Sequence, residues 1–169
     1  MSMSEGSDFQ KALHAYWRYE YIEAPKEKNQ TLFEDIAKSL KGSDEDNYVL
    51  KRTLHSYLML NAFPYTAGHL LAIPNKTVQH LNDLSADERA DWFDLVAFAE
   101  TLLHKALHPD GLNIGMNLGK CAGAGIPSHL HMHIVPRWIG DHNFMPVIGE
   151  TRVLSSSLQT MWKRLKAFC

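Results

Sequence analysis

The stretch that decides the fold is His129-Leu130-His131-Met132-His133-Ile134-Val135, in which three histidines alternate with apolar residues. Successive side chains of a β-strand point to opposite faces of the sheet. The alternation therefore predicts a strand over 129–136 whose imidazoles share one face while its apolar residues face the core. Proline stands at position 136, where the end of a strand tolerates a missing backbone N–H.

Four further strands are predicted from runs of aromatic and aliphatic residues. Turn signals such as Phe63-Pro64 and Ala67-Gly68 bound these runs. The expected ranges are 48–52, 57–61, 69–73 and 112–118. Together with 129–136 they make five strands. Because strands and helices fall in separate runs, the sequence predicts an α+β fold with an antiparallel sheet.

The clearest helix is predicted over 86–107. Ser85 and Glu88 have the spacing of a capping box at its start, and apolar residues recur along it at intervals of three and four. We assign this stripe to the core and not to a ligand site. Shorter helices are expected over 9–19, 32–40 and 156–168, the last with one apolar face.

Composition bounds the class of protein. The chain has 169 residues, of which 45% are hydrophobic, and a formal net charge of -2, as expected for one domain with extensions. This charge gives no field that attracts nucleic acid or an anionic membrane. No apolar run reaches the roughly 18 residues of a membrane span. With two cysteines and no basic-then-apolar N-terminus, we expect a cytoplasmic, reduced protein.

Three interpretations of the alternating histidines compete. A solvated polar face would accommodate one histidine but does not explain three in strict alternation. A zinc site is limited by distance, because same-face neighbours on a strand lie about 6.7 Å apart and the outer pair roughly 13 Å apart. Zinc holds each nitrogen at about 2 Å, so one ion takes two of these histidines but hardly all three.

The third interpretation is a site for a chain of phosphates. A row of imidazoles can line a polyphosphate, with one nitrogen attacking phosphorus while its neighbours bind oxygens and protonate the leaving group. The glycine-rich loop over 119–127 favours this interpretation, since glycines let backbone N–H groups approach an anion closely. The histidines therefore favour chemistry on phosphorus.

These segments resemble those of a known family. The run 129–135 is similar to the histidine-triad (HIT) motif, three histidines separated and followed by apolar residues. Upstream, Asn61-Ala-Phe-Pro-Tyr-Thr-Ala-Gly68-His69-Leu-Leu-Ala-Ile-Pro74 is similar to the family's segment of Asn, then Pro-Gly-His, four apolar residues and Pro. Pro136-Arg137-Trp138 resembles the branch of dinucleoside polyphosphate hydrolases and phosphorylases. The likeness covers about 48–138.

The resemblance implies a fold and an assembly. The expected fold is HIT-like: an antiparallel five-stranded sheet with a long helix and a C-terminal helix, the sheet extended across a homodimer. The HIT domain is expected at 43–138, after an N-terminal extension over 1–42 with a tail and short helices. A C-terminal extension with a helix is expected over 139–169.

The resemblance also implies roles for matched residues. His131 is expected to be the nucleophile that forms a nucleotidyl-phosphohistidine, oriented by His129. His133 is expected at the α-phosphate and leaving group, and His69 to complete a histidine quartet. The expected substrate contacts are Asn61 with the ribose, Asn117 with the α-phosphate, the backbone of Gly125 before the triad, and Trp138 beside the substrate.

Two departures from the family pattern affect these expectations. Many relatives carry a Cys-x-x-Cys zinc pair, where this chain has Thr31-Leu-Phe-Glu34, and a following histidine whose place is near Thr77. We therefore expect no structural zinc and no required cofactor, with any divalent cation carried on the substrate phosphates. Many relatives also place Gln, Ser or Thr shortly before the triad, where Gly125 offers only its backbone.

The implied function is cleavage of a nucleotide phosphoanhydride by a hydrolase or phosphorylase, a nucleotidyltransferase in mechanism. Dinucleoside polyphosphates such as diadenosine tetraphosphate are the expected substrates, and nucleoside phosphoramidates are an alternative. A nucleotide-binding regulator without turnover and a zinc-dependent hydrolase are alternatives of other classes. Trapping of a nucleotidylated protein and metal analysis distinguish them.

Overall fold

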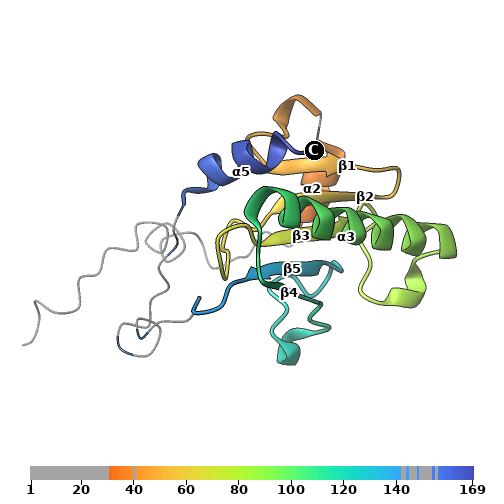
Figure 1. Ribbon diagram of the computed structural model, residues 1–169. Helices are drawn as coiled ribbons and strands as arrows, with labels where there is room; N and C mark the ends of the chain where they lie inside the picture. Colours follow the sequence, from red (N-terminus) through yellow and green to blue (C-terminus); the bar gives the residue numbers. More distant parts are fainter. Residues whose placement is uncertain (1–30, 40, 142–143, 145–147, 149–153, 155) are drawn as a thin grey trace, which may run out of the picture. The chain divides into compact units, whose positions relative to one another are not determined.

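The structure is a computed structural model that describes residues 31–39, 41–141, 144, 148, 154 and 156–169 (Figure 1). The chain divides into two units, one made of 29–141 with 154–169 and the other of 1–28 with 142–153. All elements below belong to the first unit, and the helix expected over 9–19 lies outside the described residues. Within the described part, no helix combines the length and hydropathy needed to cross a bilayer.

Five strands form one antiparallel sheet in the order β1-β2-β3-β5-β4 (Figure 1). The strands are β1 (Val49–Arg52), β2 (Ser56–Leu60), β3 (Leu70–Pro74), β4 (Gly111–Gly115) and β5 (Met132–Arg137). This arrangement confirms the predicted five-stranded antiparallel sheet. β5 pairs with β3 on one side and with β4 on the other, so the strand that follows the first two triad histidines lies inside the sheet.

The strand that carries the histidines is shorter than predicted. It begins at Met132 and not at residue 129, so His129 and His131 precede the ladder. The reason lies in the partner strand, because β3 ends at Pro74, which has no backbone N–H to donate. The carbonyl oxygen of Pro74 instead lies 2.8 Å from Nε2 of His129. The strand predicted over 112–118 is also shorter, since β4 ends at Gly115.

The predicted alternation of faces nevertheless continues through the irregular residues. Leu130, Met132 and Ile134 are buried in the larger apolar cluster. His131 turns to the other side of the chain, where its ring lies against Phe33. Side-chain alternation therefore extends two residues beyond the hydrogen-bonded strand.

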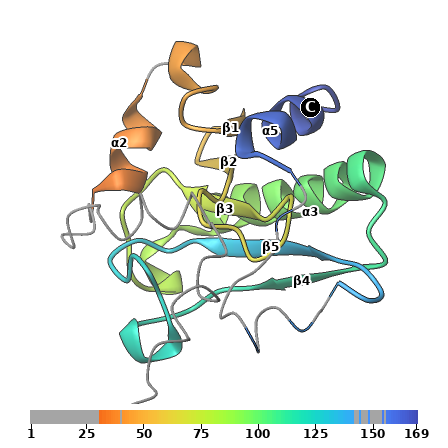
Figure 2. The ribbon, with the colours of Figure 1, turned by 90° about the vertical axis from the view of Figure 1, so that its left-hand side faces the viewer.

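One face of the sheet is covered by α3 (Ala86–Leu107) and α5 (Leu158–Lys166) (Figure 2). α3 begins at the predicted capping box, in which Ser85 Oγ accepts from the Glu88 N–H and Glu88 Oε2 accepts from the Ser85 N–H. The apolar stripe of α3 is buried, as predicted: Trp92, Leu95, Val96, Ala99, Leu102, Leu103 and Ala106. The expected C-terminal helix is confirmed as α5, with Ser157 as its N-cap.

The opposite face carries α2 (Leu32–Lys38), the helix predicted over 32–40 (Figure 2). Its buried residues Phe33 and Ile36 pack with a smaller apolar cluster from the sheet. That cluster contains Val49, Tyr57, Met59, Leu71 and Ile73. The sheet is therefore packed on both faces. The apolar cluster under α3 and α5 is the larger one, and the cluster under α2 is the smaller one.

Candidate active site

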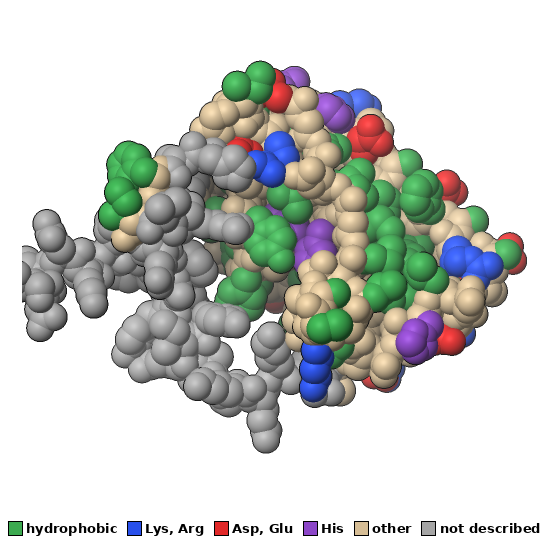
Figure 3. Space-filling model, turned by 90° about the horizontal axis from the view of Figure 1, so that it is seen from below, with side chains coloured by type: hydrophobic (Ala, Val, Ile, Leu, Met, Phe, Trp, Pro, Cys, Tyr) green, Lys and Arg blue, Asp and Glu red, His purple; other side chains and the backbone are tan. Residues whose placement is uncertain are grey.

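The four predicted histidines lie together on the side of the sheet that α2 covers. The ring centroids of His131 and His133 are 5.1 Å apart, and those of His69 and His133 are also 5.1 Å apart. Asn61, just after β2, joins the group through its side-chain nitrogen, 3.3 Å from His69 Nδ1. Histidine side chains reach the surface between apolar side chains in the view of Figure 3.

One backbone contact determines which ring nitrogen of His131 carries the proton. Its Nδ1 lies 2.9 Å from the carbonyl oxygen of His129, and because a carbonyl only accepts, Nδ1 carries the proton. Nε2 therefore keeps its lone pair. His131 is 5% exposed, and this burial holds its pKa below the usual range. An uncharged imidazole with a free lone pair is the form that attacks an electrophile.

His133 has the opposite tautomer to His131, with its proton on Nε2 and its lone pair on Nδ1. The backbone N–H of Tyr65 donates to Nδ1 of His69 at 3.1 Å, so the proton of neutral His69 is on Nε2. That Nε2–H donates to Nδ1 of His133 at 2.9 Å, which places the proton of His133 on its own Nε2. This N–H is buried and has no partner among the described residues. Burial and the neighbouring His131 lower the pKa of His133 to about 4, so it is a neutral donor.

The position of His69 depends on the glycine that precedes it. Gly68 has a left-handed backbone with φ of +86°, and a Cβ added there would lie 2.5 Å from Cδ1 of Leu107 on α3. The neighbouring Thr66 hydroxyl donates to the Pro136 carbonyl at 2.9 Å, which ties this loop to the end of β5. The loop thus places His69 directly before β3, facing His133.

His129 meets His131 through its backbone rather than through its ring. Its Nε2–H donates to the carbonyl of Pro74, and its Nδ1 is buried with no partner among the described residues. Burial lowers the pKa of His129 as well. The orienting role expected for His129 is therefore compatible with the carbonyl that holds His131 Nδ1–H.

Two aromatic residues that were not predicted also contact the histidines. The Tyr65 ring stacks on His133 at 5.8 Å with an interplanar angle of 20°, and Phe33 of α2 lies 5.2 Å from His131 and 5.7 Å from His129. Tyr65 lies only four positions before His69, and this short spacing in sequence is a signal that could have predicted its contact with the histidines. Phe33 is far from the motif in sequence, and no local pattern points to it.

Three predicted substrate contacts lie outside the histidine group. The side chain of Asn117 lies against Gly123 in the glycine-rich loop, Gly125 is exposed, and Trp138 is half-buried after β5. Within the described part of the chain, none of the three has a hydrogen bond or ring contact with the four histidines. Their expected partner is the substrate, so these roles stay predictions.

Thr31, Glu34 and Thr77, which the family resemblance matches to zinc-ligand positions of many relatives, are hydrogen-bonded polar residues. The Thr77 hydroxyl donates to Oε2 of Glu34 at 3.3 Å, and the Thr31 hydroxyl donates to Asp35 at 2.9 Å. Among the described residues, no group of three or more His, Cys, Asp or Glu side chains is arranged to hold a metal ion.

Comparison with known proteins identifies the family. A family model described as the HIT domain matches residues 43–138. The chain belongs to the HIT family. This HIT chain is 39% identical over 117 residues to the AP-4-A phosphorylase of Mycobacterium tuberculosis, a match that covers 69% of this chain and 60% of that one. It is 37% identical over 89 residues to the asymmetrical bis(5'-nucleosyl)-tetraphosphatase of Schizosaccharomyces pombe, covering 53% and 48%.

Solved structures agree with this assignment. The Caenorhabditis elegans NitFhit protein has a TM-score of 0.58 at 30% identity, covering 72% of this chain and 26% of that one. The diadenosine triphosphate hydrolase of Plasmodium falciparum, solved with Cyclomarin A, has a TM-score of 0.58 at 26% identity, covering 72% and 76%. The predicted resemblance to the dinucleoside polyphosphate branch of HIT proteins is confirmed. The chain spans less than two thirds of the length of the AP-4-A phosphorylase and of the bis(5'-nucleosyl)-tetraphosphatase.

Proposed function

We propose that this HIT protein cleaves the phosphoanhydride chain of a dinucleoside polyphosphate, such as diadenosine tetraphosphate, through a covalent nucleotidyl-His131 intermediate. The observation that carries the proposal is the pair of opposite tautomers: His131 presents a lone pair and the adjacent His133 presents an N–H. The names of the two relatives, a phosphorylase and a tetraphosphatase of such nucleotides, support the substrate class.

In the first step Nε2 of His131 attacks the α-phosphorus. The N–P bond forms as the bond from phosphorus to the bridging oxygen breaks, and the rest of the polyphosphate leaves with the electron pair. His133 Nε2–H donates to a phosphate oxygen and stabilises the charge that develops there. The carbonyl of His129 accepts from Nδ1–H throughout, which stabilises the positive ring that the new N–P bond creates.

In the second step an oxygen nucleophile attacks the same phosphorus, and the N–P electron pair returns to Nε2 of His131. Water gives a nucleoside monophosphate, whereas inorganic phosphate gives a nucleoside diphosphate, and the nucleophile releases its proton to solvent. Two displacements in place of one lower the barrier of each step, as in other covalent mechanisms. The match to the phosphorylase covers 69% of this chain and the match to the tetraphosphatase 53%, which favours inorganic phosphate as the acceptor.

We further propose that the protein supplies no metal site of its own for this reaction and that a divalent cation travels on the substrate phosphates. Phosphate-bound Mg²⁺ commonly keeps water ligands and needs few protein groups. Metal analysis of the purified protein checks this: stoichiometric zinc whose removal abolishes turnover would favour the zinc-dependent alternative.

The same HIT chain is proposed to pair with a second copy through β4. This strand is one edge of the sheet, and its Ile114 is 44% exposed. At the other edge, the carbonyls of Val49 and Leu50 accept hydrogen bonds from side chains of α5. An open edge strand is a template for pairing. Light scattering should give a dimer mass that Ile114→Lys reduces to a monomer mass; a monomeric wild type would contradict the proposal.

Product analysis with diadenosine tetraphosphate tests the function. The wild type, His131→Ala and the exposed-histidine control His104→Ala are incubated with and without inorganic phosphate. ADP plus ATP only with phosphate establishes a phosphorylase, and AMP plus ATP without phosphate establishes a hydrolase. We expect His131→Ala to lose at least about 10³-fold of the rate because the nucleophile is gone, and His104→Ala to match the wild type.

The covalent step has its own readout. Rapid quenching followed by intact-mass measurement should show the wild type heavier by one nucleotidyl group and His131→Ala unmodified. Undiminished turnover by His131→Ala rules out the mechanism. Tight nucleotide binding by the wild type with neither turnover nor the mass increase would favour a binding regulator.

A further inference from the structure

The helix α2 lies outside the residues that match the HIT family model, yet it contacts the catalytic histidines. The match begins at residue 43, whereas α2 ends at Lys38. Phe33 of α2 is 5% exposed, and its ring centroid lies 5.2 Å from that of His131 and 5.7 Å from that of His129. One wall around the proposed nucleophile is therefore contributed from outside the matched domain.

A helix this short does not keep its place without tertiary anchors. α2 has seven residues, far below the length at which an isolated helix is stable in water. Its apolar contribution comes from Phe33 and Ile36, with Ala37 partly buried beside them. The position of Phe33 over the histidines must therefore depend on polar contacts as well.

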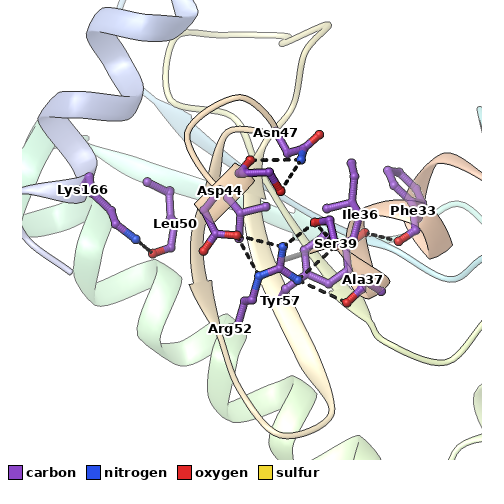
Figure 4. Close-up of polar contacts among 12 residues, drawn as sticks. Phe33, Ile36, Ala37, Ser39, Asp44, Asn47, Leu50, Arg52, Tyr57 and Lys166 are labelled. Atoms are coloured by element: carbon purple, nitrogen blue, oxygen red, sulfur yellow. Dashed lines mark hydrogen bonds and ion pairs between the residues drawn. The ribbon is translucent and has the colours of Figure 1, made fainter. Parts of the chain in front are cut away.

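Arg52 of β1 provides the main polar contact (Figure 4). Its guanidinium donates to the carbonyls of Ile36 and Ala37 at 3.0 and 3.3 Å, to the Ser39 hydroxyl at 3.0 Å and to Oδ1 of Asp44 at 2.8 Å. The Arg52 and Asp44 side chains are only 13% and 16% exposed. The planar fork of arginine reaches these acceptors together and places positive charge at the C-terminus of the helix, where the last carbonyls have no i+4 N–H of the helix to accept from.

Tyr57 of β2 is the second anchor and acts on the residue that contacts the histidines. Its buried hydroxyl donates to the carbonyl of Phe33 at 2.8 Å (Figure 4). The Arg52 guanidinium carbon lies 5.7 Å from the centroid of the Tyr57 ring, so the two anchors adjoin. Between them they fix both ends of α2 to neighbouring strands of the sheet.

We propose that Arg52 and Tyr57 are positioning residues for the proposed nucleophile, and that they act by holding α2 so that Phe33 packs on His131 and His129. The proposal rests on the proposed function in taking His131 as the nucleophile. Among the described residues, neither Arg52 nor Tyr57 has a hydrogen bond or ring contact with the four histidines. They fix the wall that excludes water from His131 and limits the orientations of its ring.

Loosening this wall has a predictable electrostatic consequence. Burial is what lowers the pKa of His131, so water admitted by a displaced Phe33 raises it toward 6.5. The titratable groups around it are His129 and His133 on its own segment, His69 before β3, and Glu34 from α2, which acts on His129. Because the attacking imidazole must be uncharged, the acidic limb of the pH–rate profile moves to higher pH.

Arg52→Met tests the proposal, because methionine keeps an aliphatic stem of similar length and loses every donor. Lys166→Met is the matched control: Lys166 Nζ donates to the Leu50 carbonyl at 2.6 Å and ties a helix to the same strand (Figure 4). With diadenosine tetraphosphate we expect Arg52→Met to lower kcat about tenfold with little change in KM. Arg52→Lys should recover part of this loss, and Lys166→Met should match the wild type.

Two measurements separate positioning from a general loss of stability. The first is NMR titration of the His131 ring in the full chain without substrate, where Arg52→Met should raise the pKa and Lys166→Met should not. The second is a double-mutant cycle with Phe33→Ala. If Arg52 acts through Phe33, the double variant is about as slow as Phe33→Ala alone. If the fold-losses in kcat of Arg52→Met and Phe33→Ala instead multiply in the double variant, the proposal is overturned.

Tyr57→Phe keeps the test decisive if Arg52→Met fails to fold, because it removes one hydroxyl and keeps the ring. We expect a loss of about threefold in kcat and a smaller rise of the His131 pKa; wild-type values for both would overturn the proposal. Turnover by His131→Ala would refute the proposed function itself. An inactive His131→Ala together with an Arg52→Met variant that behaves like Lys166→Met would refute only the positioning roles.

Discussion

The two faces of the sheet are built in different ways. Under α3 and α5, a continuous apolar cluster joins helices and strands. Under α2, the apolar cluster is small, and the buried polar residues His69, His129 and His131 lie beside it. The face under α3 and α5 therefore contributes stability through apolar burial. The face under α2 holds imidazoles that are largely shielded from water.

The polar anchors of the two faces differ accordingly. On the α3 and α5 side, the buried Trp92 and Trp162 each donate one hydrogen bond to a strand carbonyl. Lys166 and Arg164 of α5 donate to the carbonyls of Leu50 and Ala106. On the α2 side, one arginine satisfies several acceptors around a seven-residue helix. The histidine face is thus held by several hydrogen bonds around one short helix in addition to packing, and both kinds of contact hold the geometry of a site.

The largest expected effect is on the apolar face. Leu95→Ala removes a fully buried side chain of α3 and leaves a cavity, so the free energy of unfolding should fall by about 2–5 kcal/mol. The kcat of the folded fraction should stay at the wild-type value, because Leu95 lies on the face away from the histidines. Urea unfolding and turnover measured on the same samples check both statements.

Ile36→Ala is the matched change on the α2 face. Its side chain is also buried, but the surrounding cluster is smaller, so the stability loss should be smaller while kcat falls. Equal losses of kcat in Leu95→Ala and Ile36→Ala would show that the two faces do not separate stability from activity.

The next effect is chemical. His133→Asn removes the Nε2–H at the end of the chain that runs from Tyr65 through His69, while a polar side chain stays at the position. We expect kcat/KM to fall about 100-fold, the lower end for a lost proton donor. Initial rates with diadenosine tetraphosphate measure this. A rate within threefold of the wild type, about the limit for a bystander, would remove His133 from the mechanism.

The histidine face should also make stability depend on pH. The folded pKa of His133 is about 4 and the unfolded value is 6.5, so the unfolded chain binds more protons between these values. Its contribution is present above pH 6.5 and is lost as the pH falls toward about 4. We expect His133→Asn to reduce this acid loss by about 1–2 kcal/mol, measured by urea unfolding across the range. Trp92→Phe, a change on the other face, should leave the dependence of the free energy of unfolding on pH as in the wild type.

The smallest expected effect concerns neither face. Lys163 Nζ lies 3.9 Å from Glu45 Oε1, and both side chains are more than half exposed. An ion pair of this kind contributes little, so Lys163→Ala should change the free energy of unfolding by less than about 0.5 kcal/mol and leave kcat unchanged. A larger change in either quantity would point to a role for this corner that its contacts do not reveal.

Periodicity predicted the apolar face well, because helix stripes and strand runs are local patterns. The stripe of α3, its capping box at Ser85 and Glu88, and the existence of all five strands follow from spacings within one element. Strand ends were predicted less accurately. The start of β5 depends on the ladder partner Pro74, which is distant in sequence and lacks an N–H.

The site was predictable only in part. The alternation of His129, His131 and His133 predicted a shared face, and the family resemblance brought in His69 and Asn61. The tautomers could not be predicted, because they depend on which carbonyl or N–H each ring nitrogen meets. Phe33 was missed because its contact with the histidines joins elements about 100 residues apart, and its own helix is too short to have a strong pattern.

The relay from Tyr65 to His133 begins at a main-chain amide, and this has a consequence for ligand binding. The polarity of the two presented ring nitrogens is set by hydrogen-bond direction and not by charge. A phosphate group can therefore be recognised by neutral groups, and the protein need not take up a proton when the ligand enters. Calorimetric binding enthalpies for a nonhydrolysable nucleotide, measured near neutral pH, should then be the same in buffers that differ in their heat of ionisation.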